Sequence, residues 1–518
     1  MLLECFKMHP LYITTPIYYV NAKPHIGHAY TTIVCDIFVR FNRMFGRDVF
    51  FSTGTDEHGK KIEQSANNAG IEPQLFTDNI SQLFKDLLPV LNITNDDFIR
   101  TTELRHKNAV THFWSRLKES GHIYLGEYSG WYDIRNEAYF SEDELVDGRS
   151  PLGGNVHYMT EECYFFKLSE FQDKLLNFYE QNPDFIFPMQ RRNEVLSFVK
   201  RGLNDLAISR TTFSWGIPVP NDPKHVIYVW LDALTNYLTL NGYPDVDQAN
   251  NERWQNVIHF VGKEIVRFHA VYWPAFLMAA DLPPPRQIVS HGWWLSEGEK
   301  MSKSVGNVQD PIKYCKLFGS DALRYFLLRE LSFGEDGNFS LAGFIGRYNA
   351  VLANAYGNLC SRVFSFVLKN CDGSVKRPPT LTGDDQLFVA AVDSELRESV
   401  SLFQRYAFSK YLEHLEHAMS LANQYMDSQK PWALRTSDRD RMEEALFWMV
   451  EQIYKITRLF YPVIPICAEK VFNQLGIAMN DAMSLSGAVP DEFHIREIET
   501  LFPRIDQFSD DFDVFSDD

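Results

Sequence analysis

Leu11-Tyr12-Ile13-Thr14-Thr15 is a short apolar run that predicts a buried strand, and Pro16 and Pro24 bracket the loop after it. Apolar residues then recur every three or four positions, which predicts a helix from about residue 28 to residue 45. A second apolar run at 49–53 predicts another strand. A strand, a helix and a strand in this order favour a parallel sheet with its chemistry at the carboxyl ends of the strands.

Two later segments repeat the signature of a strand followed by a loop. They are 257–261, followed by Gly262, and Ile288-Val289, followed by Ser290-His291-Gly292. We therefore predict an α/β fold in which a Rossmann-type parallel sheet is split by an inserted connective subdomain and followed by an all-α helical bundle. The predicted boundaries are 1–116 and 226–296 for the two halves of the sheet domain, 117–225 for the insertion, 297–345 for the region after the sheet, and 346–518 for the bundle with an acidic C-terminal tail.

The composition is that of a folded, acidic protein. Of 518 residues, 45% are apolar and 23% are charged, and 50 basic residues face 68 acidic ones, for a net charge of −18. This balance excludes a globally basic nucleic-acid coat protein, so any nucleic-acid site must be a local patch. The seven cysteines form no Cys-x-x-Cys pair, and no eighteen apolar residues run together. We therefore expect reduced thiols, no membrane segment and a cytoplasmic location.

Two short motifs suit phosphate chemistry. His25-Ile26-Gly27-His28 precedes the first helix, where backbone N–H groups and the helix dipole attract an anion and the imidazoles add hydrogen bonds. Lys300-Met301-Ser302-Lys303-Ser304 lies between two glycines, and its ammonium groups suit a pyrophosphate whose charge develops in the transition state. Taken singly, the first motif is equally consistent with two structural histidines, and the second with a solvated surface loop.

Together, the two motifs resemble those of the class I aminoacyl-tRNA synthetases. Further segments narrow the resemblance to the methionyl-tRNA synthetase family: Thr15-Pro16-Ile17-Tyr18-Tyr19, Gly54-Thr55-Asp56-Glu57-His58-Gly59, Trp215-Gly216-Ile217-Pro218-Val219-Pro220, Val229-Trp230-Leu231-Asp232-Ala233, Gly262-Lys263-Glu264-Ile265 and His291-Gly292-Trp293. The resemblance extends from about residue 11 to residue 475. It implies activation of L-methionine with ATP and Mg²⁺, and transfer of methionine to the 3′-terminal adenosine of initiator and elongator tRNA(Met) through its 2′-hydroxyl.

The resemblance also implies a methionine pocket. Asp56, at the end of the second strand, matches the ligand of the α-ammonium group, although a loop or capping aspartate is the plainer alternative. The side-chain pocket matches residues that are otherwise ordinary core: Ile17, Tyr19, Trp230, Ala233, Tyr237, Ile288 and His291. Aromatic walls suit a polarisable thioether. Since binding excludes homocysteine poorly, we expect its rejection by cyclisation to the thiolactone.

The ATP site and the catalytic groups follow from the same resemblance. His25 and His28 match the groups that hold the phosphates, and Gly27 allows the adenine to lie close to the backbone. Lys303 matches a group that acts in the transition state, with Lys300 assisting it. Glu264 is the expected ribose contact. The reaction needs no protein nucleophile, because positioning and charge stabilisation carry it.

The insertion and the C-terminus depart from much of the family. Asp133 and Asn136 occupy positions where many relatives have zinc-binding cysteines, and the second ligand pair is missing around residues 147 to 156. We therefore predict no metal site and no zinc. No segment follows Asp518 that could form the tRNA-binding, dimerising domain of some relatives, so we expect a monomer.

The helical bundle is expected to read the anticodon. Asn358 and Arg362 share one helix face, and Trp432 matches the platform on which the first anticodon base stacks. The alternatives are a surface Asn/Arg pair and a packing tryptophan. From 346 to 380, five basic residues face one acidic residue, and this stretch lies on the expected tRNA path. A second basic stretch on that path contains Arg191, Arg192, Lys200, Arg201 and Arg210.

Two other functions compete with this one. A small-molecule nucleotidyltransferase shares the histidine motif and the sheet, but it lacks the roughly 170 residues of helical pattern seen here. A non-catalytic tRNA-binding relative is expected to lose phosphate-site residues, yet both motifs are intact. We therefore favour the function that the resemblance implies, the attachment of methionine to tRNA.

Overall fold

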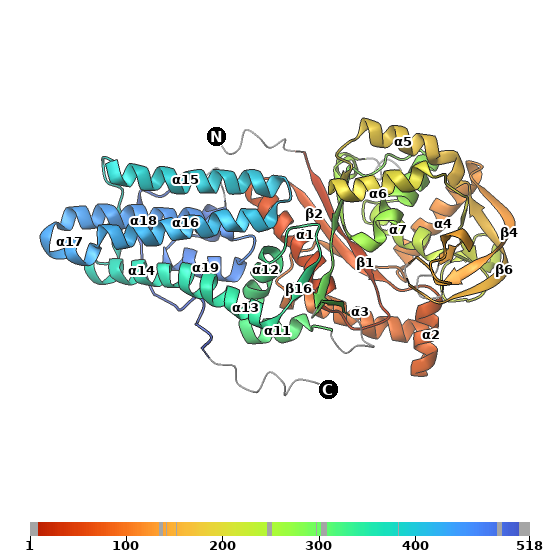
Figure 1. The fold of residues 1–518 in the computed structure, drawn as a ribbon, viewed down its shortest axis with the longest axis horizontal. Coiled ribbons are helices and arrows are strands. Elements are labelled where there is room, and N and C mark those ends of the chain that lie inside the picture. Colours follow the sequence, from red (N-terminus) through yellow and green to blue (C-terminus); the bar gives the residue numbers. More distant parts are fainter. Residues whose placement is uncertain are drawn as a thin grey trace. The chain divides into compact units, whose positions relative to one another are not determined.

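The computed structural model describes residues 9–133, 138–140, 142–151, 153–245, 251–296, 298–301, 308–381, 383–483 and 489–506. The chain forms two compact units, and many of their elements are labelled in Figure 1. The sheet unit consists of Met8–Val39 and Arg47–Gly292. The helical unit consists of Met1–Lys7, Arg40–Gly46 and Trp293–Asp518.

A six-stranded sheet, parallel throughout, forms the centre of the sheet unit. Its order is β3 (Asp97–Arg100), β2 (Val49–Asp56), β1 (Leu11–Tyr19), β12 (Val257–Gly262), β13 (Gln287–His291) and β7 (Ile186–Phe187). The predicted split is confirmed, because β1 from the first half pairs with β12 from the second, with Tyr12 opposite Val257. At the carboxyl ends, Tyr19 lies opposite Asp56, and Gly262 lies opposite His291. The topology therefore brings four motifs that are distant in sequence to one edge.

Helix α1 (Ile26–Met44) carries the histidine motif at its start. It begins two residues after Pro24, and its apolar stripe, including Ile33 and Ile37, is fully buried. The predicted helix from 28 to 45 therefore agrees with the observed one to within two residues. The other helices of the sheet unit are α2 (Lys60–Ala69), α3 (Pro73–Val90), α4 (Leu104–Glu119), η2 (Leu168–Phe171), α5 (Gln172–Gln181), α6 (Met189–Lys200), α7 (Val229–Thr239), α9 (Glu252–Gln255), η3 (Lys263–Ile265), the π-helix η4 (Phe268–Tyr272) and α10 (Trp273–Ala279).

The predicted insertion contains a separate antiparallel sheet in the order β5 (Ala138–Phe140), β4 (Ile123–Asp133), β6 (Val156–Phe166) and β8 (Leu206–Ala207). A short 3-10 helix, η1 (Glu142–Glu144), follows β5. A second antiparallel sheet is formed by β10 (Pro218–Val219), β11 (Asp222–Ile227) and β9 (Ser209–Arg210). The segment also returns to the main sheet, since β7 pairs with β13 through Ile186 and Ile288. Part of the stretch expected to stand apart therefore extends the parallel sheet by one edge strand.

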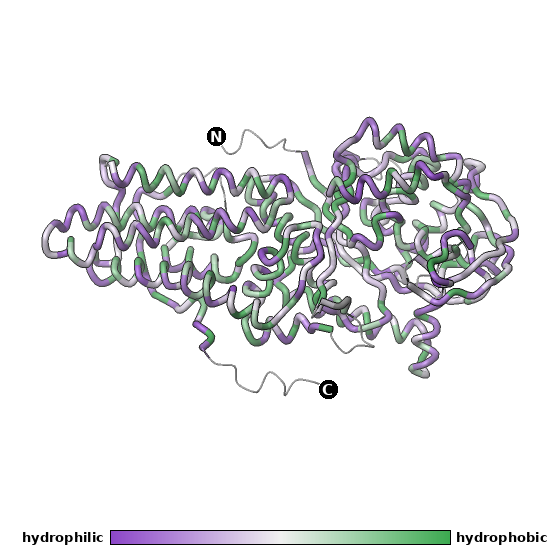
Figure 2. Tube along the Cα trace, in the orientation of Figure 1, coloured by the Kyte–Doolittle hydropathy of each residue, from purple (hydrophilic) through white to green (hydrophobic). Residues whose placement is uncertain are grey.

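The helical unit begins with a small sheet of β15 (Glu299–Lys300), β14 (Trp294–Ser296) and β16 (Gly337–Phe339). Its long helices α14, α15, α16 and α18 run side by side as a bundle, and polar and apolar positions alternate along them (Figures 1 and 2). The expected all-α bundle also contains one two-stranded sheet, β17 (Ser374–Lys376) with β18 (Glu492–His494). The helices are α11 (Pro311–Phe318), α12 (Ser320–Arg329), α13 (Leu341–Arg347), the π-helix η5 (Tyr348–Gly357), α14 (Asn358–Asn370), α15 (Gly383–Gln404), α16 (Phe408–Gln429), α17 (Pro431–Ser437), α18 (Arg439–Phe460), α19 (Pro465–Gln474) and α20 (Met479–Met483).

Among the residues that the structure describes, no helix combines the length and the apolar character needed to cross a lipid bilayer.

Candidate functional site

The two histidines at the start of α1, His25 just before it and His28 in its first turn, are oriented by backbone hydrogen bonds. The N–H of His25 donates to Nδ1 of His28 at 3.1 Å, and the N–H of Gly27 donates to Nδ1 of His25 at 3.0 Å. Because each Nδ1 accepts, each neutral ring carries its proton on Nε2, which is the form that donates to a phosphate oxygen. Burial, and then the neighbouring His25, hold the pKa of His28 well below its ordinary value. The loop therefore presents two neutral donors at a helix N-terminus.

Gly27 is needed to bring the two imidazoles together. A Cβ at this position would lie 2.8 Å from Cε1 of His25, and the ring centroids of His25 and His28 are 3.9 Å apart. The space beside Gly27 is therefore occupied by the His25 ring. Its role in the adenine contact expected from the sequence stays a prediction.

Asp56 ends β2 beside Tyr19 of β1. Its side chain is buried at the edge of the sheet, and its carbonyl oxygen accepts from the N–H of Val20 at 3.2 Å. Two residues earlier along both strands, Ile17 lies opposite Gly54. A Cβ at Gly54 would lie 2.2 Å from the Ile99 carbonyl oxygen, so only glycine fits at this position. A carboxylate thus stands next to the partly buried Ile17 and Tyr19, as an ammonium ligand beside an apolar pocket requires.

Helix α7 and the π-helix η4 form an aromatic cluster. The Trp230 ring stacks on Phe268 with centroids 3.8 Å apart and planes 4° apart. The hydroxyl of Tyr237 lies 2.8 Å from Nε2 of His269, whose Nδ1–H donates to the Ile265 carbonyl at 3.0 Å. The second bond leaves Nε2 as an acceptor, so the Tyr237 hydroxyl donates to it. Burial lowers the pKa of His269 to about 4, which keeps the ring neutral.

Sequence reasoning missed Phe268 and His269. It ended the motif after β12 at Ile265, although His269 lies only four residues further along the same segment at the carboxyl end of a strand. A histidine in this position was the available signal. The π-helical turn that aims both rings at α7 carries no signal in the sequence, and such turns are often found at functional sites.

The remaining predicted pocket residues occupy different surroundings. Ala233 is buried on α7, and Ile288 belongs to the same apolar cluster as Tyr237. Nε2 of His291 lies 2.8 Å from the Thr31 hydroxyl, and its ring meets Tyr30 edge-on, so it contacts α1. Burial lowers the pKa of His291. The structure therefore places His291 with the histidine-motif helix, whereas His269 contacts Tyr237 and Trp230.

The lysine motif is only partly described. The backbone of Lys300 lies in β15 and pairs with Leu295 of β14, whereas Lys303 lies outside the described residues. Glu264, the expected ribose contact, follows β12, and its carboxylate lies against Gly262, where a Cβ would be 2.6 Å from it. The roles of all three stay predictions.

The predicted anticodon residues lie on the surface of the helical unit. Asn358 is exposed at the start of α14, and Arg362, one turn later, pairs with Asp427 at 2.8 Å. Asp427 belongs to the last turn of α16 and lies five positions before Trp432 in the sequence, so this bond connects α14 to the end of α16. Trp432 is 46% exposed in α17, which follows Lys430 in a left-handed conformation (φ 49°). The tryptophan is therefore a surface residue rather than a packing residue.

Asp133, which stands where a zinc-binding cysteine was expected in relatives, takes part in a hydrogen-bonded turn. The buried Asp133 accepts a hydrogen bond from the Ser150 hydroxyl, which in turn accepts from the N–H of Gly154 at 3.0 Å. A Cβ on Gly154 would lie 2.0 Å from the Asp133 carboxylate, so the turn closes directly on it. Asn136 lies outside the described residues, and no group of three or more potential metal ligands occurs among those described. The carboxylate and hydroxyl do not fit a thiolate zinc site.

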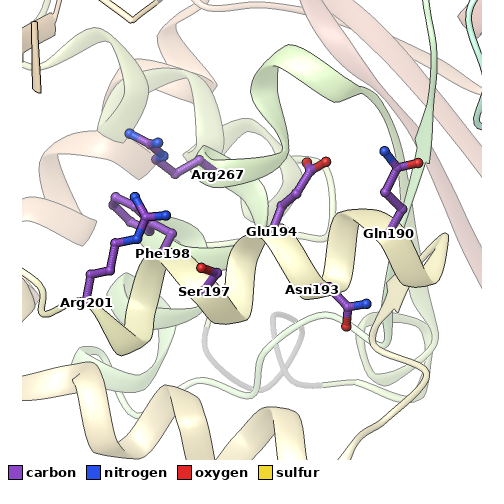
Figure 3. Close-up of a pocket in the computed structure, with 7 residues that line it drawn as sticks. All are labelled: Gln190, Asn193, Glu194, Ser197, Phe198, Arg201 and Arg267. Atoms are coloured by element: carbon purple, nitrogen blue, oxygen red, sulfur yellow. The ribbon is translucent and has the colours of Figure 1, made fainter.

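An open pocket of about 500 Å³ lies along α6, and Arg267, the residue before η4, lies on its other side (Figure 3). Arg201 from the predicted basic stretch lines it, and the Arg267 guanidinium lies 3.9 Å from the centre of the Phe198 ring. Arg210 was also expected on this path, but it is buried and donates to the carbonyls of Ala207 and Ser209. Arg210 is therefore a structural residue, because its guanidinium is buried over the Tyr132 and Tyr228 rings and its Nη1 donates to two backbone carbonyls.

Comparison with known proteins is consistent across sequence and structure. The family described as tRNA synthetases class I (M) matches residues 11–158 and 140–364. The chain is 52% identical over 472 residues to methionine–tRNA ligase of Rickettsia felis, covering 90% of this chain and 92% of that protein. It is 49% identical over 508 residues to methionine–tRNA ligase of Rickettsia bellii, covering 96% and 99%. Its fold is similar to Mycobacterium tuberculosis methionyl-tRNA synthetase in complex with methionyl-adenylate, with a TM-score of 0.93, 44% identity, and coverage of 96% and 100%.

Proposed function

Because this chain belongs to the methionine–tRNA ligases of the class I tRNA synthetase family, we propose that it activates L-methionine with ATP and transfers it to tRNA(Met). Identity near 50% over at least nine-tenths of the chain supports this assignment. The complex with methionyl-adenylate is that of a synthetase 44% identical to this chain, and it supports methionine and ATP as the substrates here.

The first step is an in-line displacement at phosphorus. A carboxylate oxygen of methionine attacks the α-phosphorus of ATP, a new P–O bond forms, and the bond to the β-phosphate oxygen breaks to release pyrophosphate. Mg²⁺ enters with ATP as part of the substrate and neutralises phosphate charge. The protein contributes orientation and charge stabilisation, and no protein group forms a covalent bond.

The predicted site residues have distinct roles in this step. We assign the Nε2–H donors of His25 and His28 to the phosphate oxygens, at the N-terminus of α1 where the dipole assists. Asp56 binds the ammonium group, and the cluster of Trp230 and Tyr237 receives the thioether. Lys300 and Lys303 act on the leaving pyrophosphate, as the sequence predicts.

The second step transfers methionine to tRNA. The 2′-hydroxyl of the terminal adenosine attacks the adenylate carbonyl, the acyl–phosphate bond breaks, and AMP leaves with the electron pair. Asn358, Arg362 and Trp432 are assigned to the anticodon, and the exposure of Asn358 and Trp432, with Arg362 partly exposed beside Asn358, supports this role.

One observation carries the proposal: two histidines with fixed Nε2–H tautomers lie at the start of α1, which follows β1, while the Asp56 carboxylate ends β2, the strand that pairs with β1. Methionine-dependent exchange of pyrophosphate into ATP tests it. We expect exchange with methionine and none with leucine. Folded protein that fails to exchange with methionine would refute the activity.

Three further features of the protein belong to the same proposal. We propose a monomer that acts in the cytoplasm and binds no zinc. The described cysteines form no disulfide with one another, which suits a reducing compartment, and Asp133, which stands where a zinc-binding cysteine was expected in relatives, accepts a hydrogen bond from Ser150. Metal analysis of protein purified without chelator tests the last point, and one zinc per chain would contradict it.

A further inference from the structure

Three buried side chains that have no role above form a continuous hydrogen-bonded chain in the sheet unit. Nδ1 of His58 lies 2.6 Å from one carboxylate oxygen of Asp232, and Nε2 of His106 lies 2.7 Å from the other. All three residues are at most 2% exposed. They come from the loop after β2, from α7 and from α4, so the chain joins three separate elements.

The direction of these bonds follows from the chemistry of the groups. A carboxylate only accepts, so His58 donates from Nδ1 and His106 donates from Nε2. Although burial alone would raise it, the charge of His58 and the bonds from both rings lower the pKa of Asp232 to about 2. The carboxylate therefore stays ionised. Short, charge-assisted bonds of this kind are among the strongest in proteins.

This hydrogen-bonded chain of three side chains connects the two halves of the methionine site, the ammonium ligand and the thioether pocket. His58 lies two residues after Asp56, the proposed ammonium ligand, and Asp232 lies between Trp230 and Ala233 on the helix of the thioether pocket. The distance between Asp56 and that pocket determines whether one methionine molecule can reach both.

The loop after Asp56 is fixed on its other sides by different contacts. Glu57 is fully buried and forms a two-point ion pair with Arg100 of β3, at 2.7 and 2.9 Å. The Trp215 indole donates to the Glu57 carbonyl at 2.6 Å, and the N–H of Gly59 donates to the Trp215 carbonyl at 3.0 Å. These contacts hold the loop to β3 and to the Trp215 segment, whereas the bond from His58 holds it to α7.

Stability alone does not account for a buried ionic chain at this place. Burying charges is costly, and replacing such a set by well-packed apolar residues is often neutral or stabilising. Directional hydrogen bonds instead fix the relative position of two elements, and apolar contacts restrict that position less because they have no preferred direction.

We propose that His58 and Asp232 are positioning residues that hold the ammonium ligand Asp56 in register with the thioether pocket on α7, with His106 orienting the carboxylate between them. A ligand that carries both an ammonium group and a thioether then binds with a higher affinity than its two groups would give if their subsites were not held in register. The proposal rests on the methionine-activating function, and it concerns residues that touch no substrate themselves.

The test compares a ligand that spans both halves with one that engages the pocket alone. The first is methionine, measured by its KM in ATP–pyrophosphate exchange. The second is 4-(methylthio)butanoate, which is methionine without its amino group, measured as an inhibitor of that exchange. For His58→Leu we expect the KM for methionine to rise about tenfold, since a bond to a charged group is lost, while the inhibition constant of the analogue changes less than about twofold.

Two conservative variants separate positioning from general packing. The amide nitrogen of Asn can occupy the place of Nδ1 and donate to Asp232, whereas that of Gln reaches the place of Nε2. We expect His58→Asn to keep the KM for methionine within about threefold of the parent, and His58→Gln to resemble His58→Leu. This pair also decides the question if His58→Leu fails to fold.

His225→Leu is the matched control. His225 is likewise fully buried in the sheet unit, but its Nδ1 pairs with Ser209 at 3.0 Å in the small sheet of the insertion. We expect its KM for methionine to match the parent. Equal KM values for the Asn and Gln variants, or equal weakening of both ligands in His58→Leu, would overturn the positioning role. A parent protein without methionine-dependent exchange would instead refute the function itself.

Discussion

The two recognition regions of this protein differ in how their side chains are held. In the sheet unit, Asp56 and Tyr237 are buried, and the imidazoles of the histidine motif are oriented by backbone N–H groups. In the helical unit, Asn358 is exposed and Trp432 is 46% exposed. The first region is preorganised inside the fold, and the second is displayed on its surface.

The difference follows from what each region has to do. Stabilising charge during a displacement requires donors fixed in advance and shielded from water, because both conditions strengthen electrostatic interactions. Stacking on a nucleic-acid base requires an accessible ring and little reorganisation elsewhere. Substitutions in the sheet unit should therefore affect methionine activation, and some of them stability, while those on the helical surface should affect only tRNA.

The largest effect is expected at the histidine motif. His28→Asn removes the Nε2–H donor, so the kcat of ATP–pyrophosphate exchange should fall by about 100-fold or more. His28→Gln places an amide donor near the Nε2 position and should keep more activity. Steady-state kinetics with saturating methionine measures both. Equal losses in the two variants would show that a donor at the Nε2 position of His28 does not serve the reaction.

A second test addresses the ammonium ligand. Asp56→Asn keeps the size of the side chain and removes its charge, so the KM for methionine should rise about 10- to 100-fold. The KM for ATP should stay within about twofold, because ATP is assigned to the histidine motif. If both KM values rose together, Asp56 would have a folding role instead.

A third test uses the pH dependence of stability. The pKa of His269 is about 4 in the fold and about 6.5 in the unfolded chain, so only the unfolded state gains the proton as pH falls below 6.5. This ring therefore contributes stability that is present above pH 6.5 and is lost as pH falls toward 4. Between pH 7 and pH 5, protonation of this histidine in the unfolded chain lowers the free energy of unfolding by about 2 kcal/mol.

Urea unfolding of the parent and of His269→Gln at both pH values measures that share. The free energy of unfolding of the parent should drop by about 2 kcal/mol more than that of the variant. An equal drop in both proteins would mean that His269 has the same pKa in the fold as in the unfolded chain.

The smallest effect is expected at the anticodon surface. Trp432→Ala should lower kcat/KM for tRNA about tenfold through loss of stacking, and it should leave ATP–pyrophosphate exchange unchanged. Aminoacylation and exchange assays on the same preparation measure the two. Because the ring is half exposed, the melting temperature should not move. A loss of ATP–pyrophosphate exchange in Trp432→Ala would show that this surface residue also affects methionine activation, contrary to the contrast between the two regions.

Much of the fold could be predicted because its signals are local. The apolar runs at 11–15 and 49–53 lie within β1 and β2, although β1 continues through Pro16 to Tyr19, where a loop was predicted. The pattern that includes Ile33 and Ile37, four residues apart, placed α1 to within two residues. The site could be predicted where a motif is contiguous, as in His25 to His28. Prediction stopped at Ile265, because the chemistry of Phe268 and His269 depends on a π-helical turn and on Tyr237.

The sequence by itself determined which chemical groups this protein has and where each lies on its own element: the histidines before a helix, the aspartate after a strand, and the tryptophan after a proline. Periodicity and motif spacing report such local relations. Only the tertiary structure decided which groups meet across the fold. His58 and Asp232 are 174 positions apart and lie 2.6 Å from each other because of how α7 packs in the sheet unit, and no local pattern encodes that packing. Tertiary packing also buries Arg210 over the Tyr132 and Tyr228 rings, although this arginine was expected from the sequence to lie on the tRNA path.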